Sequence, residues 1–228
     1  MRIIGVALTF AYYLSALAFL GNYVVKALQW IKSKPLNVAA SDRITPKTFT
    51  LAAFDILFFR RLLIVNDVLW IGEWVFHISF GLVVLRHLRY FLDPVPEWIW
   101  SIQTIGIIAG YVLPAAFGYI AVMKLCIEKK QYVSSYNFFL LALIFVISVT
   151  GLLMKNVYHP DIVAIKEFMM GAVTLRFIST SESPLFIFHF VMVLILFIKL
   201  PTHVFAAPLT IMAARQRDEI VKELVHEK

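Results

Sequence analysis

The sequence predicts an all-α integral membrane protein, a five-helix bundle with its amino terminus outside the cell and its carboxyl terminus in the cytoplasm. Three observations predict this fold class. First, 61% of the 228 residues are hydrophobic and 15% are charged, whereas a soluble domain has about 25% charged residues. Second, five apolar stretches reach the roughly 20 residues that a helix needs to cross a bilayer. Third, basic residues concentrate in the loops on one side. This composition excludes a soluble enzyme, a disordered chain and a secreted disulfide scaffold.

The five stretches account for most of the chain. They cover residues of about 3–31, 68–92, 98–127, 136–154 and 184–206. The first is too long for a signal peptide and lacks a small-residue cleavage site, so we expect it to be a spanning helix. We expect a single transmembrane domain over residues 1–228, with an amphipathic tail at 208–228. Residues 49–65 read as an interfacial segment on the inner face. Residues 161–175 read as a short outer helix, which either caps a pocket or only shields the bundle.

The distribution of Lys and Arg predicts the orientation. The loop at 32–66 holds six basic residues, the loop between the third and fourth stretches holds two, and the tail holds four. The opposite side holds four, or six when Arg86 and Arg89 at the end of the second stretch are counted. The positive side faces the cytoplasm, which puts the amino terminus outside. The net charge of +7 therefore indicates a multi-pass protein of the cell membrane with lipid as its neighbour, and no nucleic-acid partner.

Four of the six histidines fall at membrane depth. His77 and His87 lie on the second stretch, and His189 and His203 lie on the fifth. Ionisable side chains at this depth are costly and are candidates for function. A single buried histidine is usually a hydrogen-bonded packing residue, but two on each of two helices favour a functional set.

Their spacing predicts two pairs. The second and fifth stretches run in opposite directions, so residues at equal depth have a nearly constant sum of residue numbers. The sum is 280 for His77 with His203 and 276 for His87 with His189, a difference of about one turn, or roughly 6 Å. The opposite pairing gives sums that differ by 24 residues. We therefore expect two bis-histidine sites, roughly 18 Å apart along the helix axes.

The pairs favour haem over other metal centres. Zinc usually takes four ligands, and few acids and no Cys lie nearby. The single Cys126 excludes an intrachain disulfide, a Cys-ligated iron–sulfur cluster and a covalent CxxCH haem. Haem iron needs only two axial side chains because the porphyrin supplies four nitrogens. The sequence therefore predicts two b-type haems, stacked across the bilayer as an electron path.

Several nearby residues are consistent with bound haem. Arg86 and Arg89 flank His87, where they either pair with haem propionates or extend to the membrane interface. Gly81 lies one turn after His77, where a macrocycle or a neighbouring helix can approach closely. Glu73 lies one turn before His77; it is either a group that supports the ligand or a marker of the helix start.

The second and third stretches resemble a known family. Residues 77–91 (HISFGLVVLRHLRYF) resemble the second helix of the gamma subunit of respiratory nitrate reductase, including the ten-residue histidine spacing. Residues 94–98 (PVPEW) and 106–114 (GIIAGYVLP) are closer to the membrane subunit of sulfite-reduction-associated (Dsr) complexes and to the cytochrome b subunit of heterodisulfide reductase. The histidine spacing of 14 on the fifth stretch also favours this subgroup. No Lys lies between Arg89 and Lys124 to match the nitrate reductase quinol-site lysine on the third helix.

The resemblance implies a dihaem cytochrome b. His87 and His189 would ligate the outer haem iron, and His77 and His203 the inner haem iron. The chain would oxidise a menaquinol-like lipid quinol near the outer face. It would pass electrons to a cytoplasmic iron–sulfur subunit of the heterodisulfide reductase type, and it would be catalytic only within a respiratory oxidoreductase complex with further subunits.

Quinol oxidation releases two protons, so we expect hydrogen-bonding and proton-relay groups near the outer haem. The candidates are Tyr90, Gln103, His159 and Lys166, with Tyr158 and Asp161 beside them. His159 is favoured because the ordinary pKa of histidine lies near neutrality. The alternative, a surface loop histidine before a proline with no role in the site, has equal weight. Two alternatives remain open: a haem-containing anchor without quinol turnover, and a haem-free anchor or transporter whose histidines relay protons or pack.

Overall fold

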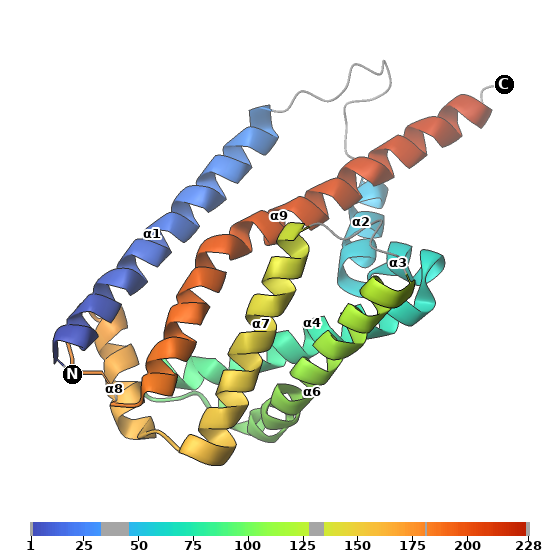
Figure 1. Ribbon diagram of the computed structural model, residues 1–228. Coiled ribbons are helices and arrows are strands. Elements are labelled where there is room, and N and C mark those ends of the chain that lie inside the picture. The colour runs from blue at the N-terminus through green and yellow to red at the C-terminus, as the bar shows by residue number, and fades with distance from the viewer. Residues whose placement is uncertain (1, 33–45, 128–134, 181, 227–228) are drawn as a thin grey trace. The chain divides into compact units, whose positions relative to one another are not determined.

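Five long apolar helices make up most of this protein. The computed structural model describes residues 2–32, 46–127, 135–180 and 182–226, and every regular element in these ranges is helical (Figure 1). The long helices are α1 (Arg2–Lys32), α4 (Asp67–His87), α6 (Gln103–Val122), α7 (Ser135–Leu153) and α9 (Pro184–His226). Each contains a segment long and apolar enough to cross a membrane, with mean hydropathy between 1.8 and 2.4. The chain is therefore a multi-pass membrane protein, and the predicted all-helical class with five spans is confirmed.

Shorter helices connect the long ones. They are α2 (Pro46–Phe58), α3 (Arg60–Val65), the 3-10 turn η1 (Leu88–Tyr90), α5 (Glu97–Ser101), the π-helical turns η2 (Met123–Ile127) and η3 (Met154–Tyr158), and α8 (Ile162–Val173). The segment predicted at 49–65 falls in two helices, because Phe59 takes a left-handed conformation (φ 48°) between them. The short helix predicted at 161–175 is α8, which Asp161 begins by accepting hydrogen bonds from the Val163 and Ala164 amides.

Two further boundaries differ from the predicted ones. The third span was expected from residue 98, but Ile102 separates α5 from α6, so the span begins at Gln103. The tail at 208–228 begins within α9, which runs through Pro201 and Pro208 without a break in its helical assignment. The placement of the tail and of α2 and α3 against a membrane face stays a prediction.

Contacts between Cα atoms divide the chain into two units, and the boundary crosses α1, α4 and α9. The first unit comprises Met1–Ala16 and Ile71–Phe197, and the second comprises Leu17–Trp70 and Ile198–Lys228. Each unit is described by itself below. The single domain over residues 1–228 stays a prediction.

The core of the first unit lies where α8 meets the amino-terminal parts of α1 and α9. Phe168 of α8 is fully buried and meets Phe186 and Phe190 of α9 edge-on, with ring centroids 6.1 and 5.6 Å apart. Edge-to-face contacts of this kind add to the stabilisation from apolar burial. The hydroxyl of Tyr13 on α1 donates a hydrogen bond of 2.5 Å to the carbonyl of Ala172. The predicted outer helix is thus an integral part of this unit's core.

Glycines bring α4 and α6 close together in the same unit. A Cβ on Gly72 would lie 2.5 Å from the ring of Tyr119, and one on Gly106 would lie 2.9 Å from the Arg86 side chain. Both glycines therefore mark close packing of these two helices. A Cβ on Gly81 would meet nothing within 4 Å, so that position on α4 is open.

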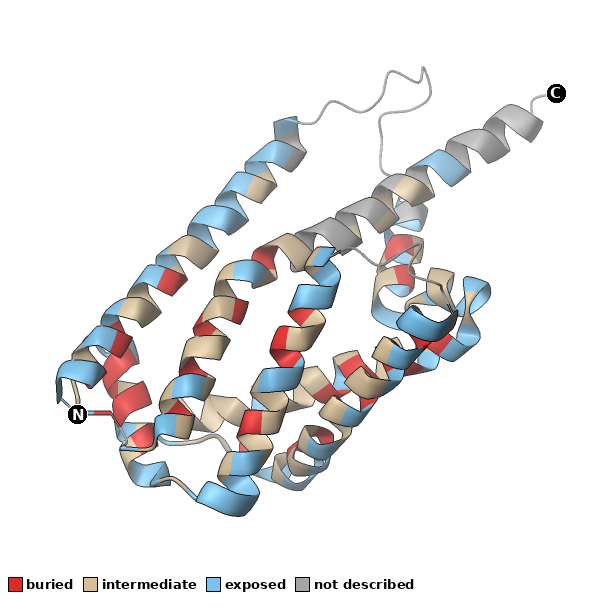
Figure 2. Ribbon diagram, viewed as in Figure 1, coloured by how far each residue is buried: buried red, intermediate tan, exposed pale blue. Residues whose placement is uncertain are grey.

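Large apolar side chains cover the outside of the helices. Exposed positions recur along α1, α6 and α7 (Figure 2), and many carry large apolar residues, such as Leu14 (69% exposed) and Ile108 (57%). In water such a surface would promote aggregation, whereas lipid tails solvate it. The surface thus agrees with the membrane assignment.

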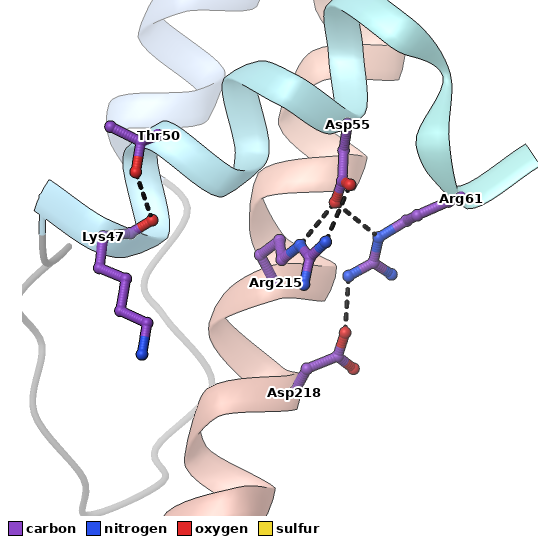
Figure 3. A network of polar contacts seen from close by, with 6 residues as sticks. All are labelled: Lys47, Thr50, Asp55, Arg61, Arg215 and Asp218. Atoms are coloured by element: carbon purple, nitrogen blue, oxygen red, sulfur yellow. Dashed lines mark hydrogen bonds and ion pairs between the residues drawn. The ribbon is translucent and has the colours of Figure 1, made fainter. Parts of the chain in front are cut away.

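A buried carboxylate organises the second unit. The side chain of Asp55 on α2 is fully buried and receives two hydrogen bonds from Arg215 of α9, at 2.5 and 2.8 Å. Arg61 of α3 donates a third bond to Asp55 at 3.2 Å and also pairs with Asp218 at 2.6 Å (Figure 3). The network joins α2, α3 and the carboxyl-terminal part of α9. The hydrogen bonds from Arg215 hold the pKa of Asp55 below its ordinary value.

Replacing Asp55 with Asn tests this network. Removing one partner of a buried ion pair leaves an uncompensated charge and costs about 3–5 kcal/mol, so thermal unfolding of the purified protein in detergent should shift to lower temperature. The matched control is Asp218→Asn, which removes a half-exposed partner and should cost less than about 1 kcal/mol. Equal destabilisation by the two variants would contradict the role of Asp55.

The same carboxylate gives a signed pH dependence. Because its pKa is lowered in the folded protein, its contribution to stability is complete above the ordinary carboxyl pKa of 3.8 and is lost as pH falls below that value. The difference in unfolding midpoint between wild type and Asp55→Asn should therefore shrink when the measurement moves from pH 7 to pH 3. A difference that grows at low pH would contradict this sign.

Candidate functional site

The candidate site is built around His87 and His189 in the first unit. His87 is the last residue of α4, and His189 lies in the second turn of α9. Both side chains are partly buried, and the two imidazoles lie within electrostatic range of each other. The two residues are 102 positions apart in the sequence, and their pairing as haem ligands stays a prediction.

His77, His87 and His189 each have a polar neighbour close to the Nδ1 atom. His77 Nδ1 lies 2.7 Å from the carbonyl of Glu73, and His87 Nδ1 lies 2.7 Å from the carbonyl of Val83, each one turn earlier on α4. A carbonyl only accepts, so in both rings Nδ1 carries the proton and donates it. In a neutral imidazole the other nitrogen, Nε2, then keeps its lone pair, which is the form that binds a metal.

His189 is held by another helix, through the side chain of Thr150 and a backbone hydrogen bond with Ile147. Its Nδ1 lies 2.9 Å from the hydroxyl oxygen of Thr150 on α7. The same hydroxyl lies 2.9 Å from the carbonyl of Val146 and 3.0 Å from that of Ile147. Thr150 is 7% exposed, so this contact is inside the unit. No sequence spacing links positions 150 and 189; the only available signal was a polar residue within an otherwise apolar span.

An ion pair accompanies His77. Glu73 on α4 lies 2.8 Å from Lys124 of η2, and its other carboxylate oxygen lies 3.8 Å from His77 Nδ1. Sequence reasoning had singled out Glu73 but not Lys124, because residues 51 positions apart carry no common motif. The pair neutralises both charges in the first unit. Glu73 therefore does more than mark the start of α4: it forms an ion pair with Lys124 next to His77.

His203 belongs to the second unit, whereas His77 belongs to the first. His203 is partly buried on α9. Its pairing with His77 therefore stays a prediction.

A pocket of about 490 Å³ opens beside His87. Its lining includes Arg89, Tyr90, Asp93, Trp100, Lys166 and Glu167. The ring of Tyr90 lies 5.9 Å from that of His87, and its hydroxyl accepts a hydrogen bond of 2.7 Å from Arg89. Lys166 Nζ lies 3.1 Å from Asp93 Oδ1 across the pocket wall. The pocket thus combines aromatic surface with donors and acceptors, as small-molecule sites do.

Two of the four predicted quinol-site residues line this pocket and two do not. Tyr90 and Lys166 line this pocket together, whereas Gln103 and His159 are not among its lining residues. His159 is exposed and has a left-handed backbone (φ 34°) where η3 ends. Its position is explained by helix termination, since histidine is among the residues that tolerate this conformation.

Two buried polar atoms in the same unit have no hydrogen-bond partner among the described residues. They are Nε of Arg86 and Oε1 of Gln103. The Arg86 side chain packs on Gly106, which lies one turn after Gln103 on α6. Buried polar groups normally have partners, so an unpaired donor and an unpaired acceptor in one helix interface are suited to a bound polar group.

Among the residues that the structure describes, no three His, Cys, Asp or Glu side chains gather closely enough to hold a metal ion by themselves. A bis-histidine haem site needs only two such side chains.

Comparisons with known proteins point to one relationship. No family model and no solved structure matches the chain. The chain is similar to the Hdr-like menaquinol oxidoreductase cytochrome b-like subunit of Archaeoglobus fulgidus, with 28% identity over 138 residues, 54% of this chain and 42% of the relative. It is also similar to the protein of the same name from Archaeoglobus profundus, with 29% identity over 153 residues, 58% of this chain and 44% of the relative.

The aligned region spans less than half of the length of each relative. Both relatives bear the name of a subunit of a menaquinol oxidoreductase, in agreement with the subgroup to which residues 94–98 and 106–114 had pointed. The chain is thus a distant homologue of the cytochrome b-like subunit of an Hdr-like menaquinol oxidoreductase.

Proposed function

We propose that this chain is a membrane cytochrome b subunit that oxidises a lipid quinol and passes the electrons through two b-type haems to an iron–sulfur partner. The observation that carries the proposal is the pair His87 and His189. The two imidazoles lie within electrostatic range in one unit, and each has its Nδ1 engaged. The printed names of both homologues support the same activity class.

The residues fit a bis-histidine haem. Donation from Nδ1 leaves Nε2 as the free ligand atom of His87, and the same holds for His77. The unpaired Nε of Arg86 is a suitable donor for a propionate. Gly81 presents open space one turn after His77 on α4. His77 with His203 would hold the second haem, and Arg89 remains a further candidate for a propionate.

The chain's own residues set the conditions for electron transfer. His87 and His189 would hold the haem iron between two imidazoles, and a haem held in this way would supply single-electron transfer. The hydrogen bonds at Nδ1 orient the rings and fix their tautomers. The ion pair of Glu73 with Lys124 compensates two charges beside His77, which lowers the cost of keeping them at membrane depth.

The pocket beside His87 is the proposed quinol site. Trp100 and Tyr90 offer aromatic surface to a quinol ring, and Lys166 Nζ is a donor for one of its oxygens. Asp93, whose side chain is 67% exposed, forms an ion pair with Lys166. It is placed to accept a quinol proton at Oδ1 and to release it to water. Gln103 Oε1, which has no protein partner, is a further acceptor for a quinol hydroxyl.

The direction across the membrane follows from the charge distribution. The loops predicted to face the cytoplasm hold most of the basic residues outside the spans. This orientation puts the quinol pocket at the outer face and a basic surface at the inner face. An iron–sulfur subunit of the heterodisulfide reductase type is the expected partner there. The name of the homologues, a subunit of an Hdr-like oxidoreductase, is consistent with it.

Haem content tests the ligands. Purified wild-type protein should carry two haems, and His87→Ala or His189→Ala should reduce the ratio of haem to protein to about half, because iron held by one imidazole is bound weakly. A pyridine haemochrome assay measures this ratio. The control is His159→Ala, an exposed histidine that should keep both haems. A wild-type protein without haem, or either ligand variant with both haems, would refute the assignment.

Quinol-driven haem reduction tests the pocket. Lys166→Met should slow haem reduction by a menaquinol analogue about tenfold or more, because a charge-assisted hydrogen bond to the substrate is worth about 1.5–3 kcal/mol. The haem spectrum should not change. The matched control is Lys155→Met, since Lys155 lies over the ring of Tyr111, 4.9 Å from its centroid, and is not among the pocket's lining residues. Equal rates in the two variants would place quinol oxidation elsewhere.

A further inference from the structure

Thr150 is a buried hydroxyl in the last turn of an apolar helix. It lies on α7, is 7% exposed, and has three polar neighbours within 3.0 Å: the carbonyls of Val146 and Ile147 and Nδ1 of His189. A helical threonine commonly donates its proton to a carbonyl of the preceding turn. That bond alone would satisfy Thr150, so its contact with His189 calls for a separate explanation.

The neighbouring carbonyls favour one direction for this contact. The hydroxyl has one proton, and both carbonyls can only accept it. When that proton goes to Val146 or Ile147, Oγ1 is left with lone pairs facing His189, and His189 Nδ1–H is the donor. The ring then has its proton on Nδ1 and a free lone pair on Nε2. With this direction, Thr150 supports the same tautomer that backbone carbonyls select in His77 and His87.

The three rings differ in what holds them. The carbonyls that hold His77 and His87 belong to their own helix, one turn away, and any sequence on α4 would supply them. His189 on α9 is held by a different helix, α7: by the Thr150 hydroxyl, 39 positions earlier in the sequence, and by a backbone hydrogen bond with Ile147. The next residue, Gly151, offers no side chain, and a Cβ there would lie 3.5 Å from His189 Cε1. The ring therefore lies against the α7 backbone and is hydrogen-bonded to its hydroxyl.

We propose that Thr150 is a positioning residue for His189: its hydroxyl fixes the rotation and tautomer of the ring so that Nε2 is the ligand atom for the haem shared with His87. The inference rests on the proposed haem function. A hydrogen bond donated by Nδ1 also raises the basicity of an axial imidazole. A more basic ligand stabilises ferric over ferrous iron, so Thr150 lowers the midpoint potential of this haem relative to the same haem without the bond.

Two substitutions at position 150 separate the hydroxyl from the shape of the side chain. Thr150→Val keeps the branched shape and removes the hydroxyl, whereas Thr150→Ser keeps the hydroxyl. The matched control is Thr9→Val: Thr9 is also fully buried in the first unit, and its hydroxyl donates only to the carbonyl of Gly5, at 2.9 Å. Each variant is purified as the full chain, together with any subunits that accompany it.

The readouts are the haem-to-protein ratio, the low-spin ferric signals in electron paramagnetic resonance, and a redox titration. His87→Ala identifies which signal belongs to the haem in question. In Thr150→Val we expect that signal alone to move and its midpoint potential to rise, or that haem alone to be lost. The other haem serves as the internal reference. Thr150→Ser and Thr9→Val should match the wild type.

Two results would overturn the inference: a Thr150→Val protein with wild-type signals and potentials, or the same change in Thr9→Val, which would indicate packing alone. Thr150→Ala is the second variant if Thr150→Val does not fold, and it carries the same expectations. A wild-type protein without haem would instead refute the proposed function, so the two failures are distinguishable.

Discussion

Within the hydrocarbon of a bilayer no water is available to satisfy a polar group, so each one needs a partner in the protein. This constraint accounts for the helical backbone, whose amide and carbonyl groups pair within each span. It also accounts for the side chains that lie at the same depth. His77 and His87 donate to carbonyls of their own helix, His189 pairs with Thr150, and Glu73 pairs with Lys124. The atoms left without a partner are therefore informative about what binds there.

The same reasoning separates structural polar groups from candidate functional ones. Asp55 in the second unit is fully satisfied by Arg215 and Arg61, so it needs no ligand and serves to join helices. Arg86 and Gln103 in the first unit each keep one buried polar atom without a protein partner. All three side chains have buried polar atoms. Only those of Arg86 and Gln103 keep hydrogen-bonding capacity for a cofactor or a substrate.

The pocket at the end of α4 places the proposed quinol site close to His87, a proposed haem ligand. Tyr90 follows His87 by three residues, so its ring contacts both the histidine and the pocket. Helix α8 contributes Lys166 to the other wall and at the same time packs Phe168 into the core. A rigid helix that is fixed by its buried face holds a polar residue precisely on the opposite face. Helix α8 therefore contributes both to the core and to the lining of this pocket.

The sequence by itself determined the membrane class, the five spans and the four histidines at membrane depth, because hydropathy and residue spacing are local properties that need no knowledge of helix rotation. From depth alone it also predicts the pairing of His87 with His189. Only the tertiary structure decided which side chains meet around each helix: Thr150 with His189, Lys124 with Glu73, and Lys166 with Asp93. It also placed Tyr90 and Lys166 in one pocket and left His159 outside its lining. Such contacts depend on the rotation and packing of whole helices, and a sequence window carries no record of either.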